Sequence, residues 1–240
     1  MLALLDAGLP GPARGVFTTR RGGASTGPWV GLDLALHVGD DPAHVEANRA
    51  LLRDELGVDR LVLGEQVHGT RVAVVTAGAP DVAPGTDGLV TAERGTALVM
   101  MAADCLPVLL ADPVAGVVGA AHAGRQGLVD GVLQEVLAAM ASLGARDVTA
   151  RIGPAVCGAC YELPEALADA VGAAVPGSRS TTSRGTPGAD LPAGAEALLR
   201  AAGVRDVQRV GGCTVEQPDL LYSHRRDGVT GRHAGVAWLP

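Results

Sequence analysis

The chain has 240 residues with a formal net charge of −7, and 48% of them are hydrophobic but only 2% aromatic. This length allows a substantial core built mainly from Val, Leu and Ala, and the acidic balance argues against a nucleic-acid surface, which needs a basic patch. All 19 basic residues are arginines. Schiff-base catalysis and a P-loop lysine are therefore excluded, and any phosphate must be bound by arginines or backbone amides.

We expect a cytoplasmic protein without a membrane or nucleic-acid partner. The chain begins Met-Leu-Ala-Leu-Leu-Asp, which lacks the basic residues of a secretory signal. No apolar run reaches the roughly 18 residues of a membrane helix. Four cysteines in a chain this long do not indicate a disulfide framework. The oligomeric state stays open.

Short apolar runs alternate along the chain with segments of helical period, and no repeat or marked linker divides it. Strands are predicted over residues 16–21, within 60–75 as two strands around a turn, and over 89–90, 106–111, 116–121, 148–152, 204–210 and 234–239, with residues 95–102 leading into the hairpin of 106–121. Helices are predicted over 42–56, 128–143, 164–175 and 191–202. The first has Asp41 as N-cap, Pro42 at its first position and Gly57 as its end. The Ser-, Thr-, Gly- and Arg-rich stretch 176–188 is predicted to be a mobile loop.

The chemical centre is predicted at the hairpin of strands 106–111 and 116–121, with residues 112–115 as its turn. If Ala111 faces Gly116, the antiparallel register places Cys105 directly opposite His122, with Cβ atoms about 4.5–5.5 Å apart. A thiol and an imidazole at this distance suit either a shared metal ion or a nucleophile with its base. Asp104, beside the thiol, suits either a catalytic role, in which it orients a ligand or relays a proton, or a structural hydrogen bond.

A third ligand and several anion-binding groups are candidates from more distant segments. His68 lies in the turn within 60–75. It is a candidate metal ligand only if the fold brings it close to the Cys105 thiol and His122. The Gly-rich turn 124–127 leads into a helix and suits either an anion or a sharp strand-to-helix turn. Arginines in the loop 20–28 and in the tail 222–232 suit phosphate or carboxylate binding, or simple solvation.

One further cysteine motif has no assigned role. Cys157 and Cys160 form a CxxC, but no second CxxC or His pair follows at zinc-finger spacing. The surroundings are not thioredoxin-like either. Metal binding, redox chemistry and a purely structural role therefore all stay open for this pair.

Seven short motifs occur in a fixed order along the chain: Gln66-Val-His-Gly69, Ala103-Asp-Cys-Leu-Pro107, His122-Ala-Gly124, Ile152-Gly-Pro154, Tyr161-Glu162, Cys213-Thr214 and Arg225-Arg-Asp-Gly-Val-Thr-Gly-Arg232. With them the chain resembles the laccase-domain (polyphenol-oxidase-like) family, whose members are described as purine nucleoside phosphorylases with adenosine deaminase activity. The resemblance implies an α+β fold over residues 1–240, a single domain of mixed β-sheets packed between layers of helices. It also implies that His68, Cys105 and His122 bind one zinc ion, with copper as the less favoured metal.

Two positions depart from the family's usual pattern. Arg125-Gln126 stands where Trp-Arg is usual after His-Ala-Gly, and Asp33 stands where Asn is usual before Leu34. Both departures concern the surroundings of the substrate rather than the metal ligands.

The leading hypothesis is a zinc-dependent phosphorylase that converts inosine, adenosine or guanosine, with methylthioadenosine as a further candidate, to base and ribose 1-phosphate, and that also deaminates adenosine. Its predicted catalytic residues are Cys105, His122 and Asp104. Its predicted phosphate ligands are Arg20, Arg225, Arg226 and Arg232. The alternatives are a Cys/His hydrolase acting on a peptidoglycan-precursor amide, a polyphenol oxidase, and a non-catalytic purine-binding protein. The preferred nucleoside and the balance of activities stay open.

Overall fold

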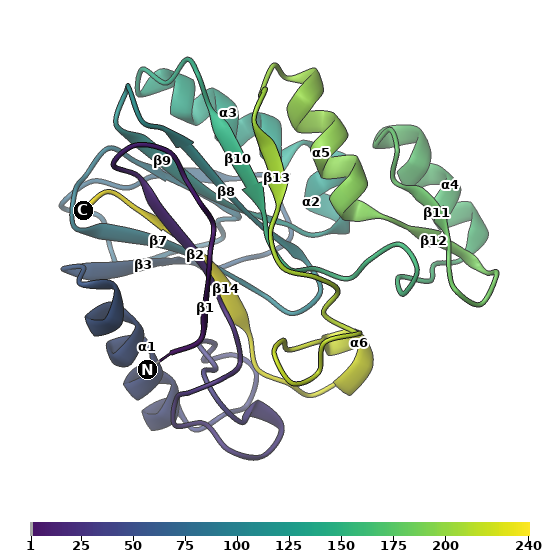
Figure 1. Ribbon diagram of the computed structural model, residues 1–240, viewed down its shortest axis with the longest axis horizontal. Coiled ribbons are helices and arrows are strands. Elements are labelled where there is room, and N and C mark those ends of the chain that lie inside the picture. The colour runs from purple at the N-terminus through teal and green to yellow at the C-terminus, as the bar shows by residue number, and fades with distance from the viewer. Residues whose placement is uncertain (1) are drawn as a thin grey trace.

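Two six-stranded mixed sheets form the body of the protein in the computed structural model, which describes residues 2–240 (Figure 1). The first sheet has the order β1 (Leu4–Asp6), β2 (Arg14–Thr18), β14 (His233–Trp238), β7 (Thr96–Ala102), β3 (Arg60–Gly64), β5 (Val82–Ala83). The second has the order β13 (Val207–Arg209), β10 (Thr149–Ile152), β8 (Leu106–Asp112), β9 (Val117–Ala123), β6 (Gly88–Thr91), β4 (Val72–Val74). Each sheet contains both parallel and antiparallel pairs.

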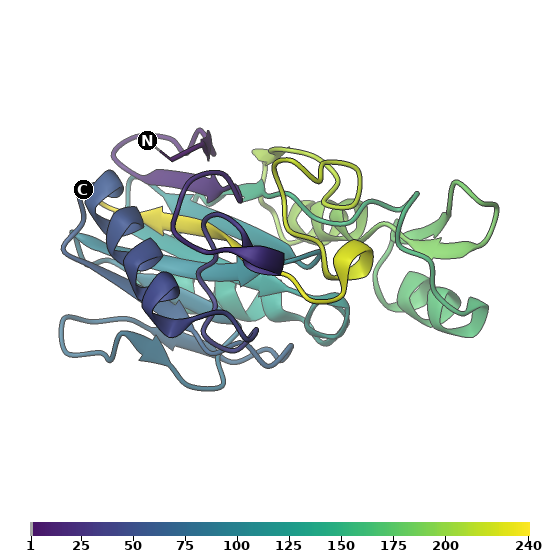
Figure 2. The same ribbon diagram turned by 90° about the horizontal axis from the view of Figure 1, so that it is seen from below.

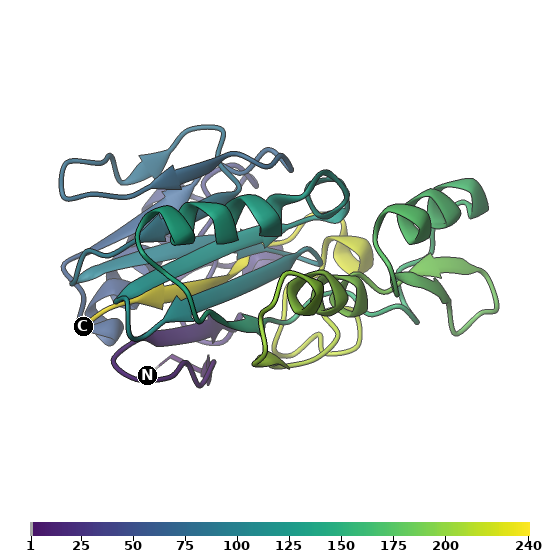
Figure 3. The same cartoon turned by 90° about the horizontal axis from the view of Figure 1, so that it is seen from above.

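The helices are α1 (Pro42–Leu56), α2 (Arg125–Asp130), α3 (Val132–Ser142), α4 (Glu165–Ala174), α5 (Leu191–Ala201) and α6 (His224–Asp227), with a 3-10 turn at Gly27–Trp29. Helix α1 covers the outer face of the first sheet (Figure 2), and α3 covers the outer face of the second (Figure 3). None of the helices within residues 2–240 is long and apolar enough to cross a membrane.

The layers follow from where the apolar side chains are buried. One cluster, which includes Phe17, Leu98 and Leu109, fills the space between the two sheets. Two outer clusters join a sheet to its helices, one through Leu52 of α1 and one through Val136 of α3. Strands β7, β8 and β9 are buried along their whole length, as their continuous apolar runs indicate. The predicted α+β fold of mixed sheets between helices is confirmed.

Helix α1 begins and ends as predicted, whereas the predicted helix 128–143 is wrong in two respects. The Asp41 carboxylate accepts a hydrogen bond from the Ala43 amide, and Gly57 ends α1 in the left-handed conformation, with φ of 64°. The second helix begins earlier, at Arg125, and is broken at Gly131, whose φ is 99°. A left-handed residue cannot continue a helix, so α3 starts afresh after it.

The central hairpin forms, but its register differs from the prediction by two residues. Leu106 pairs with Ala123 and Pro107 with His122, so Cys105, just before β8, is not directly opposite His122. The reason lies in the turn, where the Asp112 carboxylate accepts two backbone hydrogen bonds and Gly116 takes a φ of 65°. The pairing therefore extends to Asp112 and Val117. Because side chains alternate with a period of two, this slip keeps the thiol and the imidazole on one face.

The stretch 176–188, predicted as a mobile loop, instead contains a small antiparallel sheet of β11 (Arg179–Thr181) and β12 (Pro187–Ala189). Its position is set by hydrogen bonds to the CxxC loop, such as that from Ser180 Oγ to the Gly158 carbonyl at 3.0 Å. With α4, this sheet forms the extension at one end of the molecule in Figures 1 and 3.

Candidate metal centre and active site

A cavity of about 640 Å³ opens at one end of the two sheets. This volume is within the range of small-molecule sites. Its walls come from segments far apart in the sequence: His37, Gln66, His68, Met101, Ala102, Ala103, Asp104, Cys105, His122, Arg125, Val156, Tyr161, Leu191, His224, Arg225 and Arg232. The cavity therefore contains all three predicted metal ligands together with basic and apolar side chains.

The three predicted ligands converge in the structure. The donor atoms of His68, Cys105 and His122 all lie within 4.8 Å of one another. Cys105 Sγ is 3.7 Å from His68 Nε2, and the two imidazole rings meet edge to face with centroids 4.8 Å apart. Tetrahedral zinc with ordinary Zn–N and Zn–S bonds separates such atoms by roughly 3.6 Å. This group could therefore bind one metal ion.

Asp87 holds two of the three ligands in place, and the sequence analysis missed it. Its carboxylate is fully buried and lies 2.8 Å from His122 Nδ1. It also accepts hydrogen bonds from the amides of Val67, His68 and Gly69, at 3.1, 3.0 and 2.8 Å. A carboxylate that binds one imidazole nitrogen directs the other toward a metal. Nothing in the local sequence distinguishes Asp87, which directly precedes β6, from an ordinary loop residue.

Two backbone features make room for the ligands. His68 has a φ of 62°, an uncommon conformation that its hydrogen bond to Asp87 stabilises. A Cβ on Gly124 would lie 2.6 Å from His68 Cδ2 and 3.2 Å from Cys105 Sγ. A side chain at position 124 would therefore displace two of the predicted ligands. Gly127 packs against the Gly69 carbonyl, where a Cβ would lie at 2.8 Å, so close packing accounts for this second glycine.

The protein groups of the site favour a thiolate beside an imidazolium. Burial raises the pKa of Cys105, but the charge of His122 and hydrogen bonds from His122 and His68 outweigh it and lower that pKa to about 6. Burial lowers the pKa of His122, but the Cys105 thiolate and Asp87 raise it to about 9. Burial also raises the pKa of Asp87, yet hydrogen bonds from His122 and the Gly69 amide lower it below its usual value. A thiolate is the form of cysteine that coordinates metals.

Asp104 lines the cavity with a carboxylate whose two oxygens both have partners. Oδ1 accepts hydrogen bonds from Thr214 Oγ1 at 2.5 Å and Ser223 Oγ at 2.7 Å, and Oδ2 accepts one from the Arg225 amide at 2.7 Å. Its backbone is in an unusual conformation, with φ of 96°. Asp104 thus ties the loops around α6 to the residue next to Cys105.

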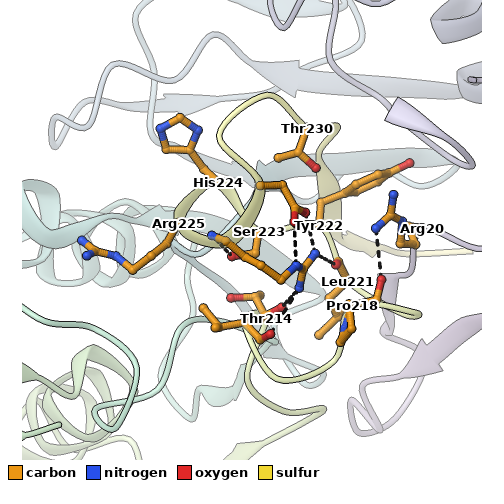
Figure 4. Close-up of polar contacts among 12 residues, drawn as sticks. Arg20, Thr214, Pro218, Leu221, Tyr222, Ser223, His224, Arg225 and Thr230 are labelled. Carbon is orange, nitrogen blue, oxygen red and sulfur yellow. Dashed lines mark hydrogen bonds and ion pairs between the residues drawn. The ribbon is translucent and has the colours of Figure 1, made fainter. Parts of the chain in front are cut away.

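The four predicted anion-binding arginines divide into two pairs. Arg225 and Arg232 line the cavity, whereas Arg20 and Arg226 do not. Arg20 donates to the Pro218 carbonyl at 3.0 Å and lies over the Tyr222 ring. Figure 4 shows it on the Tyr222 side of the loop, with Arg225 on the opposite side.

Arg226 binds the carbonyl oxygens of Thr214 and Leu221 and the Asp227 carboxylate. With Arg20 it cross-links the loop that carries α6. Arg125, which the sequence analysis noted only as a departure from the family's pattern, lines the cavity at the start of α2. Tyr161, noted only as part of a motif, also lines it, and its ring lies 4.7 Å beneath the Arg225 guanidinium. The sequence analysis assigned neither side chain a role.

A family model described as multi-copper polyphenol oxidoreductase laccase matches residues 14–240. The chain belongs to this family. It is 52% identical over 239 residues to a purine nucleoside phosphorylase of Streptomyces griseus, covering 97% of both chains. It is 50% identical over 230 residues to one of Mycobacterium tuberculosis, covering 94% of this chain and 92% of the other.

Two solved structures share the fold of this chain. A Neisseria meningitidis protein is 36% identical, with a TM-score of 0.89 over 99% of this chain and 98% of its own. YlmD from Geobacillus stearothermophilus is 35% identical, with a TM-score of 0.89 over 98% and 96%. The resemblance stated from the ordered motifs is thereby confirmed.

Proposed function

We propose that this laccase-family chain is a zinc-dependent purine nucleoside phosphorylase, which transfers the ribosyl group of a nucleoside from its base to orthophosphate. The observation that carries the proposal is the charge of the cavity. In a chain of net charge −7, three arginines line the cavity, and its one carboxylate is engaged by three hydrogen bonds. The names of the relatives at 50–52% identity support the same activity.

The proposed roles follow from where each side chain lies. Arg225, Arg232 and Arg125 bind phosphate, since guanidinium groups bind its oxygens bidentately. The phosphate oxygen bonds to C1′ of the ribose while the bond from C1′ to the purine nitrogen breaks. The base leaves with the bonding electrons and takes up a proton. Met101 and Val156 supply apolar wall for the purine.

His68, Cys105 and His122 would hold the zinc ion, with Asp87 orienting His122. With three protein ligands, a bound zinc ion would supply an open position for a Lewis acid and would lower the pKa of bound water. We propose that adenosine is also deaminated here, with water replacing the C6 amino group and ammonia leaving. Asp104 positions the loop of α6 through its three hydrogen bonds. Arg20 and Arg226 support the same loop, and their predicted contact with phosphate stays a prediction.

The test is phosphate-dependent release of hypoxanthine from inosine by the purified protein. Cys105→Ala removes a metal ligand and should abolish release. Arg225→Gln should raise the KM for phosphate, whereas the matched Arg21→Gln, on an exposed arginine outside the cavity, should not. Release of ammonia from adenosine tests the deaminase activity separately. Hypoxanthine release that is absent, independent of phosphate, or undiminished in Cys105→Ala would refute the phosphorylase proposal.

Two observations favour competing chemistry at this same site. A His₂Cys set with Met101 in the cavity wall contains the ligand types of a blue-copper centre. Within residues 2–240, however, no other group of histidines accompanies it to form a multicopper centre. The Cys105 thiolate beside His122 also suits a cysteine hydrolase. Metal analysis separates the possibilities, because zinc bound to the thiolate leaves no free nucleophile, and copper with oxidation of phenols would indicate an oxidase.

A further inference from the structure

A second cluster of metal-ligand side chains lies outside the cavity. Strands β10 and β13 are parallel neighbours, and the isolated bridge between Ala155 and Cys213 extends their pairing. Parallel strands end at the same edge of a sheet, so the loops that follow them leave side by side. One loop carries the CxxC and the other carries Cys213, which are more than 50 residues apart in the sequence.

Each loop forms a tight turn with two donor side chains three residues apart. In the first, the amide of Cys160 donates to the carbonyl of Cys157 at 3.0 Å. In the second, which presents Cys213 and Glu216, the amide of Gln217 donates to the Cys213 carbonyl at 3.1 Å. The chain thus contains Cys-x-x-Cys facing Cys-x-x-Glu. This pairing of two short turns is the arrangement of ligands in many zinc ribbons.

The distances between the four donor atoms suit a tetrahedral ion. All four lie within 4.8 Å of one another, and Cys160 Sγ is 3.6 Å from Glu216 Oε1. A tetrahedral zinc ion separates a thiolate sulfur from a carboxylate oxygen by roughly 3.6 Å. The Cys157 amide also points at Cys213 Sγ, at 3.4 Å, as backbone amides do toward thiolates. None of these cysteines forms a disulfide.

We propose a second, structural zinc site with four protein ligands, Cys157, Cys160, Cys213 and Glu216. Three thiolates select zinc over the hard cations Mg²⁺ and Ca²⁺. Four protein ligands leave no open position, which distinguishes a structural site from a catalytic one. Cys213 is buried but Glu216 is exposed, so the ion can enter from solvent.

The site would stabilise one wall of the cavity. Thr214, next to Cys213, donates to the Asp104 carboxylate, and Tyr161, next to Cys160, lies beneath Arg225. An ion that joins the two turns would therefore hold in place the residues that contact Asp104 and Arg225, both of which line the cavity. The proposal is independent of the reaction, because none of its ligands lines the cavity.

The test is metal content and thiol protection in full-length protein purified with reductant and zinc. Wild type should bind about two zinc ions and Cys105→Ser about one. The double variant Cys105→Ser/Cys160→Ser should bind no zinc ion tightly. The chain has four cysteines, so Cys105→Ser retains only the three thiols of the proposed site. These should be unreactive toward a thiol reagent with zinc bound and become reactive after chelation, a readout that needs no further variant to fold.

Cobalt provides a second readout, since Cys105→Ser loaded with Co²⁺ should show the absorption of tetrahedral thiolate coordination. Glu216→Gln should retain that absorption with weaker affinity for the metal. One zinc per wild-type chain with none in Cys105→Ser would overturn the proposal. So would a Cys157–Cys160 disulfide in protein purified with zinc but without reductant, which would indicate a redox pair instead. Loss of phosphorolysis in these variants bears on neither result.

Discussion

Asp33 stands where the family usually has asparagine, and the structure explains what this carboxylate costs. Its side chain is fully buried, and only Oδ1 has partners, the amides of Ala35 at 3.1 Å and Arg232 at 2.8 Å. Oδ2 has none among the described protein atoms. Burial raises the pKa of Asp33 from 3.8 to about 6, although hydrogen bonds from the two amides oppose the shift. The charged form is therefore disfavoured in the folded protein.

We expect Asp33→Asn to stabilise the protein above pH 6 and not at pH 4. A carboxyl group with a raised folded pKa favours folding fully below pH 4, and this contribution is lost as the pH rises from about 4 to about 6. A rise from 3.8 to about 6 corresponds to about 3 kcal/mol. Asparagine keeps the acceptor for both amides but buries an unpaired amino group, at a cost of about 1–2 kcal/mol. The net gain at pH 8 is about 1–2 kcal/mol, or an increase in Tm of roughly 2–6 °C.

The measurement is urea denaturation of both proteins from pH 4 to pH 8. Asp112→Asn is the matched control with the opposite expectation. Burial raises the pKa of Asp112, but hydrogen bonds from four backbone amides lower it below its usual value. Because that folded pKa is depressed, its contribution is present at pH 8, and Asp112→Asn should cost about 1–3 kcal/mol there. A gain for Asp33→Asn that is constant across the pH range, or a loss at pH 8, would refute the reasoning.

Three further substitutions test the surroundings of the site. Asp87→Asn should weaken zinc binding about 10–100-fold, because the amide cannot accept all the hydrogen bonds that orient His122 and the loop of His68. Competition with a chelator measures this affinity, and an unchanged affinity would contradict the role of Asp87. Gly124→Ala should reduce zinc content without unfolding the protein, as circular dichroism can show, since its Cβ would lie 2.6 Å from His68 Cδ2; full zinc content would show that the ligands can shift. Tyr222→Phe should lower the free energy of unfolding by about 1 kcal/mol, because the buried hydroxyl donates a hydrogen bond shared between the carbonyls of Trp29 and Val30. An unchanged free energy of unfolding in urea denaturation would show that this hydrogen bond does not stabilise the protein.

Much of the fold could be predicted because the signals are local. Helix α1 is marked by a capping carboxylate at Asp41 and by Gly57. The central hairpin is marked by two apolar runs around a turn. The break at Gly131 was missed, since a glycine inside an amphipathic segment is compatible with a continuous helix until tertiary packing selects the left-handed conformation. The register was missed by two residues for a related reason, because the continuous apolar runs of β8 and β9 are equally compatible with both registers.

By itself the sequence determined which residues could do the chemistry. Cys105 and His122 lie at the same end of one hairpin in any register that keeps the apolar face buried, and the ordered motifs added His68. Only the tertiary structure decided what surrounds them. Asp87, behind His122, comes from a segment whose distance from Cys105 depends on how the strands pair.

The CxxC shows the same division most clearly. Cys157 and Cys160 indicated a ligand pair without partners, because Cys213 and Glu216 follow more than 50 residues later. The parallel pairing of β10 with β13 brings the two turns together. This pairing depends on the burial of both strands against distant parts of the chain, which no local pattern encodes. The type of ligand at each turn, by contrast, can be read directly from the sequence.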